Sequence, residues 1–178
     1  MASDPPMMDA SHADEALHDA IHHYEGVALS GKAMKAFAAP GTHIFMEHEL
    51  VGKNRSWMVG STGAYIMLYE FPGKAMGHWI CGWAQPDGSV HHFDPYGKPP
   101  NFYTQKKTYL NVLEEGKYTY SHIDFQGHNR SIDTCGRHCL VRLMFRDHTD
   151  QEYSRLVHRN GNADEVVTLM TLHATFNN

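Results

Sequence analysis

Two apolar segments joined by a turn signal constrain the fold of this chain more than any other feature of its sequence. Residues 78–84 and 89–94 are rich in apolar and aromatic side chains, and residues 85–88 (Gln-Pro-Asp-Gly) separate them. Proline presets one backbone dihedral and glycine permits a positive φ, so this tetrapeptide favours a tight reversal of the chain. The pattern therefore predicts a β-hairpin.

Weaker patterns predict further strands and helices on both sides of this hairpin. Residues 65–69 form a short apolar and aromatic run typical of a buried strand, and residues 118–125 alternate in the manner of another strand. Apolar residues at helical spacing predict the helices, and Ser30 can cap the second of them. The predicted helices cover residues 14–24, 30–37, 101–115, 135–147 and 164–175.

The length and composition indicate one globular domain. The chain has 178 residues, of which 42% are hydrophobic and 20% are charged. We expect residues 1–13 to form a flexible lead and residues 14–178 a single domain. No secretory signal or membrane-spanning segment is predicted. The three cysteines are too few for a disulfide scaffold, and free thiols favour a reducing compartment.

The predicted hairpin brings a histidine and a carboxylate together at its open end. With the turn centred near Asp87, facing residue numbers sum to about 173, and His78 lies within one residue of facing Asp94. Facing residues on antiparallel strands have Cβ atoms about 4.5–5.5 Å apart. A carboxylate beside an imidazole fixes its tautomer and stabilises its protonated form, so this pair is a candidate catalytic base and its orienting group.

Cys135 is the candidate nucleophile. It opens the predicted helix of residues 135–147, where the backbone N–H groups and the helix dipole both favour a thiolate. Gly136 leaves space for a substrate carbonyl beside the backbone. An imidazole oriented by a carboxylate, as expected of His78, would complete a thiolate–imidazolium pair.

Two further side chains are expected at this site. Gln126 precedes the cysteine by nine residues, and its amide can donate a hydrogen bond to the oxyanion of a tetrahedral intermediate. Trp79 directly follows the histidine, and its indole N–H could contact the substrate. Cys135, His138 and Cys139 lack a fourth ligand, so neither a metal site nor a cofactor is predicted.

These motifs together resemble the adenain family, the maturation proteases of adenoviruses. The resemblance is closer to the adenain-like proteases of virophages and Polinton-type elements, which carry GHW, FD-x-[YF]-G-x-P-P and TCG-x-HC motifs in this order. It covers about residues 65–145, and each motif is specific only as part of the ordered set. The matching segments here are residues 77–79, 93–100, 126 and 134–139.

The resemblance implies both a fold and a set of roles. The fold would be α+β, papain-like, with a central and mostly antiparallel sheet flanked by helices and the nucleophile at the start of a helix. His78 would be the general base, Asp94 its partner, Gln126 the oxyanion donor and Cys135 the nucleophile, while Trp79 and Gly136 would contact substrate. The implied activity is that of a cysteine endopeptidase that cleaves capsid precursor proteins during virion maturation.

The resemblance also bears on partners and location. The expected partners are precursor polypeptides and, as in the family, an activating peptide; a net charge of −5 argues against the DNA cofactor that stimulates adenain. In adenain the activating peptide is joined by a disulfide to a cysteine outside the nucleophile helix. Cys81 lies within a predicted strand and does not match the position of that cysteine. The implied location is the virion or the host cytoplasm or nucleus. The sequence does not indicate an oligomeric state or a membrane partner.

Two alternatives remain open at this stage. Proteases of ubiquitin-like modifiers share the order His, Asp, Gln, Cys, but they usually read DCG where this chain has Thr134-Cys135-Gly136. A catalytically silent capsid or scaffold protein that retains the fold is the other alternative, against which the intact set of four residues argues.

Overall fold

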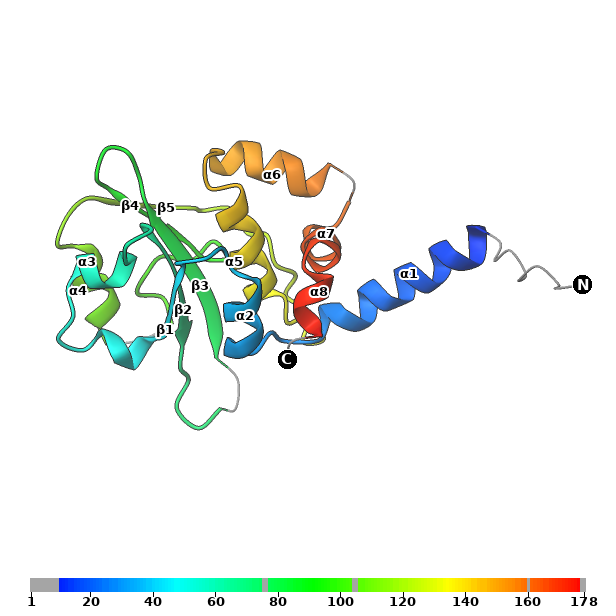
Figure 1. Cartoon of the computed structure of the whole chain (residues 1–178), viewed down its shortest axis with the longest axis horizontal. Helices are drawn as coiled ribbons and strands as arrows, with labels where there is room; N and C mark the ends of the chain where they lie inside the picture. Colours follow the sequence, from blue (N-terminus) through cyan, green and yellow to red (C-terminus); the bar gives the residue numbers. More distant parts are fainter. Residues whose placement is uncertain (1–9, 75–76, 104–105, 160, 177–178) are drawn as a thin grey trace, which may run out of the picture.

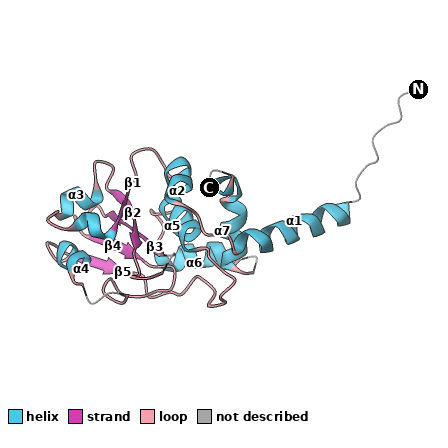
Figure 2. Ribbon diagram, turned by 90° about the horizontal axis from the view of Figure 1, so that it is seen from below, coloured by secondary structure: helices cyan, strands magenta, loops and turns pink. Residues whose placement is uncertain are grey.

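A five-stranded mixed sheet forms the centre of the molecule. The computed structural model describes residues 10–74, 77–103, 106–159 and 161–176. The strands lie side by side in sequence order (Figures 1 and 2). Their bounds are β1 His43–Met46, β2 Ala64–Tyr69, β3 His78–Ala84, β4 Val90–Phe93 and β5 Tyr118–Tyr120.

The sheet is less antiparallel than expected. β2–β3 and β3–β4 are antiparallel, whereas β1–β2 and β4–β5 are parallel, so the sheet is mixed. The prediction of an α+β fold with a central sheet flanked by helices is confirmed. The segment between β4 and β5 includes a helix, and such a crossover returns the chain in the same direction. β1 was not predicted, and β5 ends well before residue 125.

The predicted hairpin is confirmed, with a register that differs by one residue. Cys81 faces Phe93 and Ala84 faces Val90, so facing numbers sum to 174. Continued past the end of the ladder, this register places Asp94 opposite Ile80, two residues from His78. An offset of two keeps both side chains on the same face, as diagonal neighbours, whereas an odd offset would separate them.

Eight α-helices and one 3₁₀ helix are described around the sheet. The predicted helix starting at Cys135 is confirmed, and Ser30 caps α2 through a hydrogen bond from Ala33 N. The predicted helix of residues 164–175 is two helices, α7 and α8, and α6 was missed. The bounds are α1 Ala10–Glu25, α2 Gly31–Phe37, η1 Glu47–Leu50, α3 Arg55–Val59, α4 Thr108–Leu113, α5 Cys135–Met144, α6 Asp150–His158, α7 Ala163–Met170 and α8 Leu172–Thr175.

The helix α1 starts before the expected domain boundary. It begins at Ala10 rather than at Asp14, and it extends away from the rest of the molecule in both views (Figures 1 and 2). The rest of the predicted lead, residues 1–9, lies outside the described residues. Among the described residues, no helix is both long and apolar enough to cross a membrane.

Both faces of the sheet are covered, and the strands alternate between two apolar clusters. In β2, Ala64 and Ile66 pack with α5 and α7, whereas Tyr65, Met67 and Tyr69 pack with α4 and residues near α3. Figure 1 shows α3 and α4 on one side of the sheet and α2, α5 and α7 on the other. Because both faces are buried, the strands read as continuous apolar runs rather than as alternating ones.

The helix α5 is buried on almost every side. Residues 135–142 are all buried, including the basic Arg137, His138 and Arg142. Arg137 donates hydrogen bonds to Thr171 O, at 3.1 Å, and to Tyr24 O, at 3.3 Å. Burial lowers the pKa of Arg137 to about 10. These bonds connect α5, which begins at Cys135, to the ends of α1 and α7.

Candidate active site

His78 and Asp94 meet at the open end of the hairpin, as predicted. His78 Nε2 lies 3.0 Å from Asp94 Oδ1, and both residues are buried. A carboxylate can only accept, so Nε2 carries the proton of this bond and Nδ1 is left for another partner. The corrected register accounts for the contact, because diagonal same-face neighbours are within reach of an imidazole.

The turn after β4 fixes the Asp94 carboxylate. Oδ1 also accepts a hydrogen bond from Tyr96 N at 2.7 Å, and Gly97 N donates to Asp94 O at 2.8 Å. Gly97 has a φ of +64°, and a Cβ there would lie 2.9 Å from the backbone of His122. The turn therefore requires glycine, which explains its place in the Phe-Asp-Pro-Tyr-Gly motif.

Cys135 is the second partner of His78. Burial disfavours the charged imidazole, but hydrogen bonds and charge from Asp94 and Cys135 outweigh it and raise the pKa of His78 to about 9. Cys135 is 8% exposed, whereas Cys81 and Cys139 are 0% exposed, so Cys135 is the most accessible of the three cysteines. The geometry brings together the three residues that a thiolate–imidazolium pair with an orienting carboxylate requires.

Two tyrosines enclose His78, and the sequence analysis missed both. The ring of Tyr96 stacks on the imidazole with centroids 5.2 Å apart and planes 22° apart. The ring of Tyr103 lies 4.8 Å away at a tilt of 52°. Burial and the nearby charge of Cys135 raise the pKa of Tyr96 to about 12. The position of Tyr96 within the motif of residues 93–100 was the available signal in the sequence.

Gln126 is bonded to the turn that contains Asp94, and the residue after it is bonded to the start of α7. Its backbone N–H donates to Pro95 O at 3.0 Å, next to Asp94. The following residue, Gly127, donates its N–H to Asp164 Oδ2 at 2.8 Å. Gln126 is 3% exposed, and its Oε1 is a buried atom with no hydrogen-bond partner among the described residues.

Asp164, at the start of α7, connects the segment that contains Gln126 to the segment that contains Cys135. Its Oδ1 accepts from the Thr134 hydroxyl and lies 2.9 Å from His138 Nε2, while Oδ2 accepts from Gly127 N. Residues adjacent to Gln126 and to Cys135 thus bind the two oxygens of one carboxylate. Burial alone would raise the pKa of Asp164, but the hydrogen bonds, with His138 first, lower it. No local motif marks this residue, because its partners come from two other segments, the loop at Gly127 and the first turn of α5.

Trp79 and Gly136 have packing roles that differ from the predicted substrate contacts. The Trp79 indole N–H, which was expected to contact substrate, donates to Leu29 O at 3.0 Å within the protein. A Cβ on Gly136 would lie 3.0 Å from Met34 Sδ and 3.2 Å from the Trp79 ring. The glycine therefore allows α5 to pack closely against these side chains rather than leaving space for a substrate.

The other two cysteines belong to the core. Cys81 and Cys139 face each other across β3 and α5, and Cys81 Sγ lies 3.7 Å from Cys139 O. Burial raises the pKa of the Cys139 thiol well above its usual range. Cys139 therefore stays a neutral thiol, in contrast to the reactive form expected of Cys135.

Comparisons with known proteins give distant relatives whose descriptions name no activity. No family model matches the chain. A protein of Sputnik virophage, described as uncharacterized protein V9, is 27% identical over 173 residues, which cover 85% of this chain and 98% of that protein. Among solved structures, the central domain of the uncharacterized Lpg1148 protein of Legionella pneumophila has a TM-score of 0.47 and 13% identity, covering 84% of this chain and 96% of that one. A TM-score at this level carries no argument about the fold.

Proposed function

We propose that this chain is an adenain-like cysteine endopeptidase that cleaves viral precursor polypeptides during virion maturation. The observation that carries the proposal is the meeting of His78, Asp94 and Cys135, with the nucleophile as the first residue of a helix. The ordered motifs around these residues support the adenain-like version of a papain-like fold. The relative in Sputnik virophage supports a viral setting, in the virion or the infected host cell.

The first chemical step is acylation of the enzyme. The Cys135 thiolate attacks the scissile carbonyl carbon, and the carbonyl π pair moves onto oxygen. The Cys135 backbone N–H and the Gln126 amide stabilise this oxyanion. The intermediate then collapses, the C–N bond breaks, and the imidazolium of His78 gives its Nδ1 proton to the leaving amine.

The second step is hydrolysis of the thioester. Neutral His78 takes a proton from water through Nδ1, and the resulting hydroxide attacks the acyl carbon. The C–S bond breaks, the carboxylic product leaves, and Cys135 returns as a thiolate beside an imidazolium. Asp94 accepts the hydrogen bond from Nε2–H throughout, so that Nδ1 always faces the sulfur.

The pH dependence of Cys135 alkylation is the first test of the Cys–His pair. We expect iodoacetamide to modify Cys135 rapidly well below pH 8 in the wild type and slowly in His78→Ala, because a thiolate then loses its imidazolium partner. Cys135→Ala, which keeps only the two fully buried cysteines, is the control for the site of labelling. Ordinary thiol behaviour in both proteins would favour a silent scaffold protein.

Substrate class requires a separate experiment. The viral precursor proteins encoded with this chain should be cleaved when co-expressed with the wild type and remain intact with Cys135→Ala. Cleavage that persists in that variant would exclude the mechanism. Labelling of Cys135 by a ubiquitin-type probe, without cleavage of precursors, would instead indicate a protease of ubiquitin-like modifiers.

A further inference from the structure

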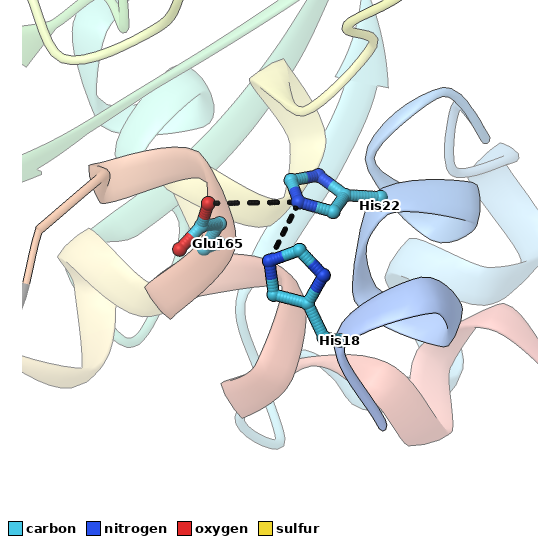
Figure 3. A group of neighbouring side chains, drawn as sticks. All are labelled: His18, His22 and Glu165. Atoms are coloured by element: carbon cyan, nitrogen blue, oxygen red, sulfur yellow. Dashed lines mark hydrogen bonds and ion pairs between the residues drawn. The ribbon is translucent and has the colours of Figure 1, made fainter. Parts of the chain in front are cut away.

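A cluster of two imidazoles and one carboxylate joins α1 to α7, and none of its members belongs to the candidate active site. His18 and His22 lie one turn apart on α1, with their Nε2 atoms 3.1 Å apart. Glu165, the third residue of α7, places its Oε1 4.0 Å from His22 Nε2. Figure 3 shows the three side chains converging from the two helices. All three ligand atoms lie within 4.8 Å of one another.

These distances fit a single divalent cation. A tetrahedral zinc ion bound at about 2.0–2.1 Å keeps its ligand atoms about 3.3 Å apart. Small side-chain movements would bring the three ligand atoms to this spacing. Two neutral imidazoles and one carboxylate are a typical zinc donor set that leaves the fourth position to water. Histidines at positions i and i+4 of a helix project from the same face, which allows both to bind one ion.

A neighbouring carboxylate orients one of the two imidazoles for this role. His22 Nδ1 lies 3.0 Å from Glu25 Oε2, and the Glu25 side chain is 7% exposed. Because the carboxylate accepts from Nδ1–H, Nε2 is the unprotonated nitrogen that a metal requires. A carboxylate–histidine–metal arrangement of this kind fixes the ring and raises its basicity as a ligand.

We propose that His18, His22 and Glu165 bind one zinc ion, or a similar divalent transition metal, that fastens α1 to α7. No metal site was predicted from the sequence. The two helices also hold the segment before Cys135: Asp133 N donates to Glu25 O at 2.7 Å, and the residue before Glu165 binds Thr134. The metal therefore stabilises the helix pair that supports the nucleophile loop.

Zinc titration by calorimetry tests the proposal in a Cys135→Ser background, which removes a thiolate that would compete for zinc. We expect one zinc ion per chain, with an affinity that falls about tenfold or more in His22→Ala and in Glu165→Gln. His23→Ala, a neighbouring exposed histidine of the same helix, should bind as the parent does. Unchanged affinity in His22→Ala, or no saturable binding below millimolar zinc, would overturn the proposal.

Thermal unfolding gives a second readout that does not depend on activity. Zinc at about a hundredfold excess over its Kd should raise the Tm of the Cys135→Ser protein by roughly 5–10 °C. The same zinc concentration should produce a much smaller rise in Glu165→Gln. An equal rise in both proteins would place the zinc elsewhere and reject the site.

Discussion

Two buried histidine–carboxylate pairs lie close together in this molecule and differ in what surrounds them. In the hairpin pair, His78 Nε2 is 3.0 Å from Asp94 Oδ1; in the helix pair, His138 Nε2 is 2.9 Å from Asp164 Oδ1. All four residues are buried. The distances alone therefore do not distinguish a catalytic pair from a structural one.

The other hydrogen bonds of the two histidines and the two carboxylates distinguish the hairpin pair from the helix pair. His78 has a thiol as its second partner, whereas His138 Nδ1 is a buried atom without a hydrogen-bond partner among the described residues. The Asp164 carboxylate also binds Thr134 and Gly127, so it connects segments. An imidazole with a nucleophile on its other side can move protons, and a carboxylate with several backbone and side-chain donors holds a loop in place.

The largest effect is expected from removing the imidazole of the hairpin pair. His78→Ala should lower kcat/KM for precursor cleavage by about 10³-fold, because the proton donor for the leaving amine is lost. The matched change in the helix pair, His138→Ala, should lower stability and leave most of the activity at low temperature. Cleavage rates and Tm of both variants measure this contrast, and equal activity losses would contradict it.

Asp94→Asn should lower kcat/KM by about 10²-fold and lower the upper pH limit of cleavage. The wild-type limit is expected near pH 9, where the raised pKa of His78 ends the thiolate–imidazolium pair. An amide removes the charge that supports the imidazolium, so the limit should shift toward neutral pH. Cleavage rates across pH measure the shift, and a limit that does not move would mean that Asp94 is not the orienting group.

The same pKa makes the stability of the protein depend on pH. Folding raises the pKa of His78 from 6.5 to about 9. The contribution of His78 to the free energy of unfolding is therefore fully present below about pH 6.5 and is lost as pH rises through 9. Chemical denaturation at pH 6 and pH 9 should show this decrease in the wild type. His78→Ala should show a smaller decrease, and an equal decrease in both would contradict the assignment.

Asp164→Asn should reduce kcat about tenfold and destabilise the fold by about 2–3 kcal/mol. The amide can present only one oxygen, so either Gly127 N–H or the Thr134 hydroxyl faces an NH₂ group instead of an acceptor. Because the change displaces Gln126 rather than the imidazole, the pH limit of cleavage should stay near 9. A shifted limit would show that Asp164 acts on the Cys–His pair itself.

The smallest effect is expected at the ring that stacks on His78. Tyr96→Phe keeps the ring and should change kcat/KM less than about threefold, whereas Tyr96→Ala removes the stacking and should cost about tenfold. Steady-state cleavage by the two variants measures the difference. A large loss in the phenylalanine variant would assign a direct role to the hydroxyl group.

The two pairs also show how far sequence reasoning extends in this chain. The hairpin pair was predictable, because both residues belong to one local supersecondary unit whose turn is visible in the sequence. The bounds of β3 and the start of α5 at Cys135 were predicted as they are observed. The register was wrong by one residue, because the turn signal places the centre of a hairpin only approximately.

The helix pair was not predictable by the same reasoning. His138 and Asp164 lie on different helices, and only the packing of α5 against α7 joins them. The intervening helix α6 was missed although Thr149 and Glu152 form a capping box at its start, which is a readable signal. The parallel pairing of β5 likewise depends on tertiary packing rather than on any local pattern.

The bonds of Asp164 to Thr134 and Gly127 can form only after Asp164 has been synthesised, which affects when the candidate site is complete. A nascent chain exposes Cys135 and His78 before Asp164 leaves the ribosome, and the bond from Thr134 to Asp164 spans 30 residues. The bond from Arg137 to Tyr24 spans 113 residues, so this contact between α1 and α5 forms only after α5 has been synthesised. We therefore expect the oxyanion side of the site to form only after α7 has been translated. Under the proposed function, incomplete chains would be poor proteases, and neighbouring precursor polypeptides would not be cleaved until α7 has been synthesised.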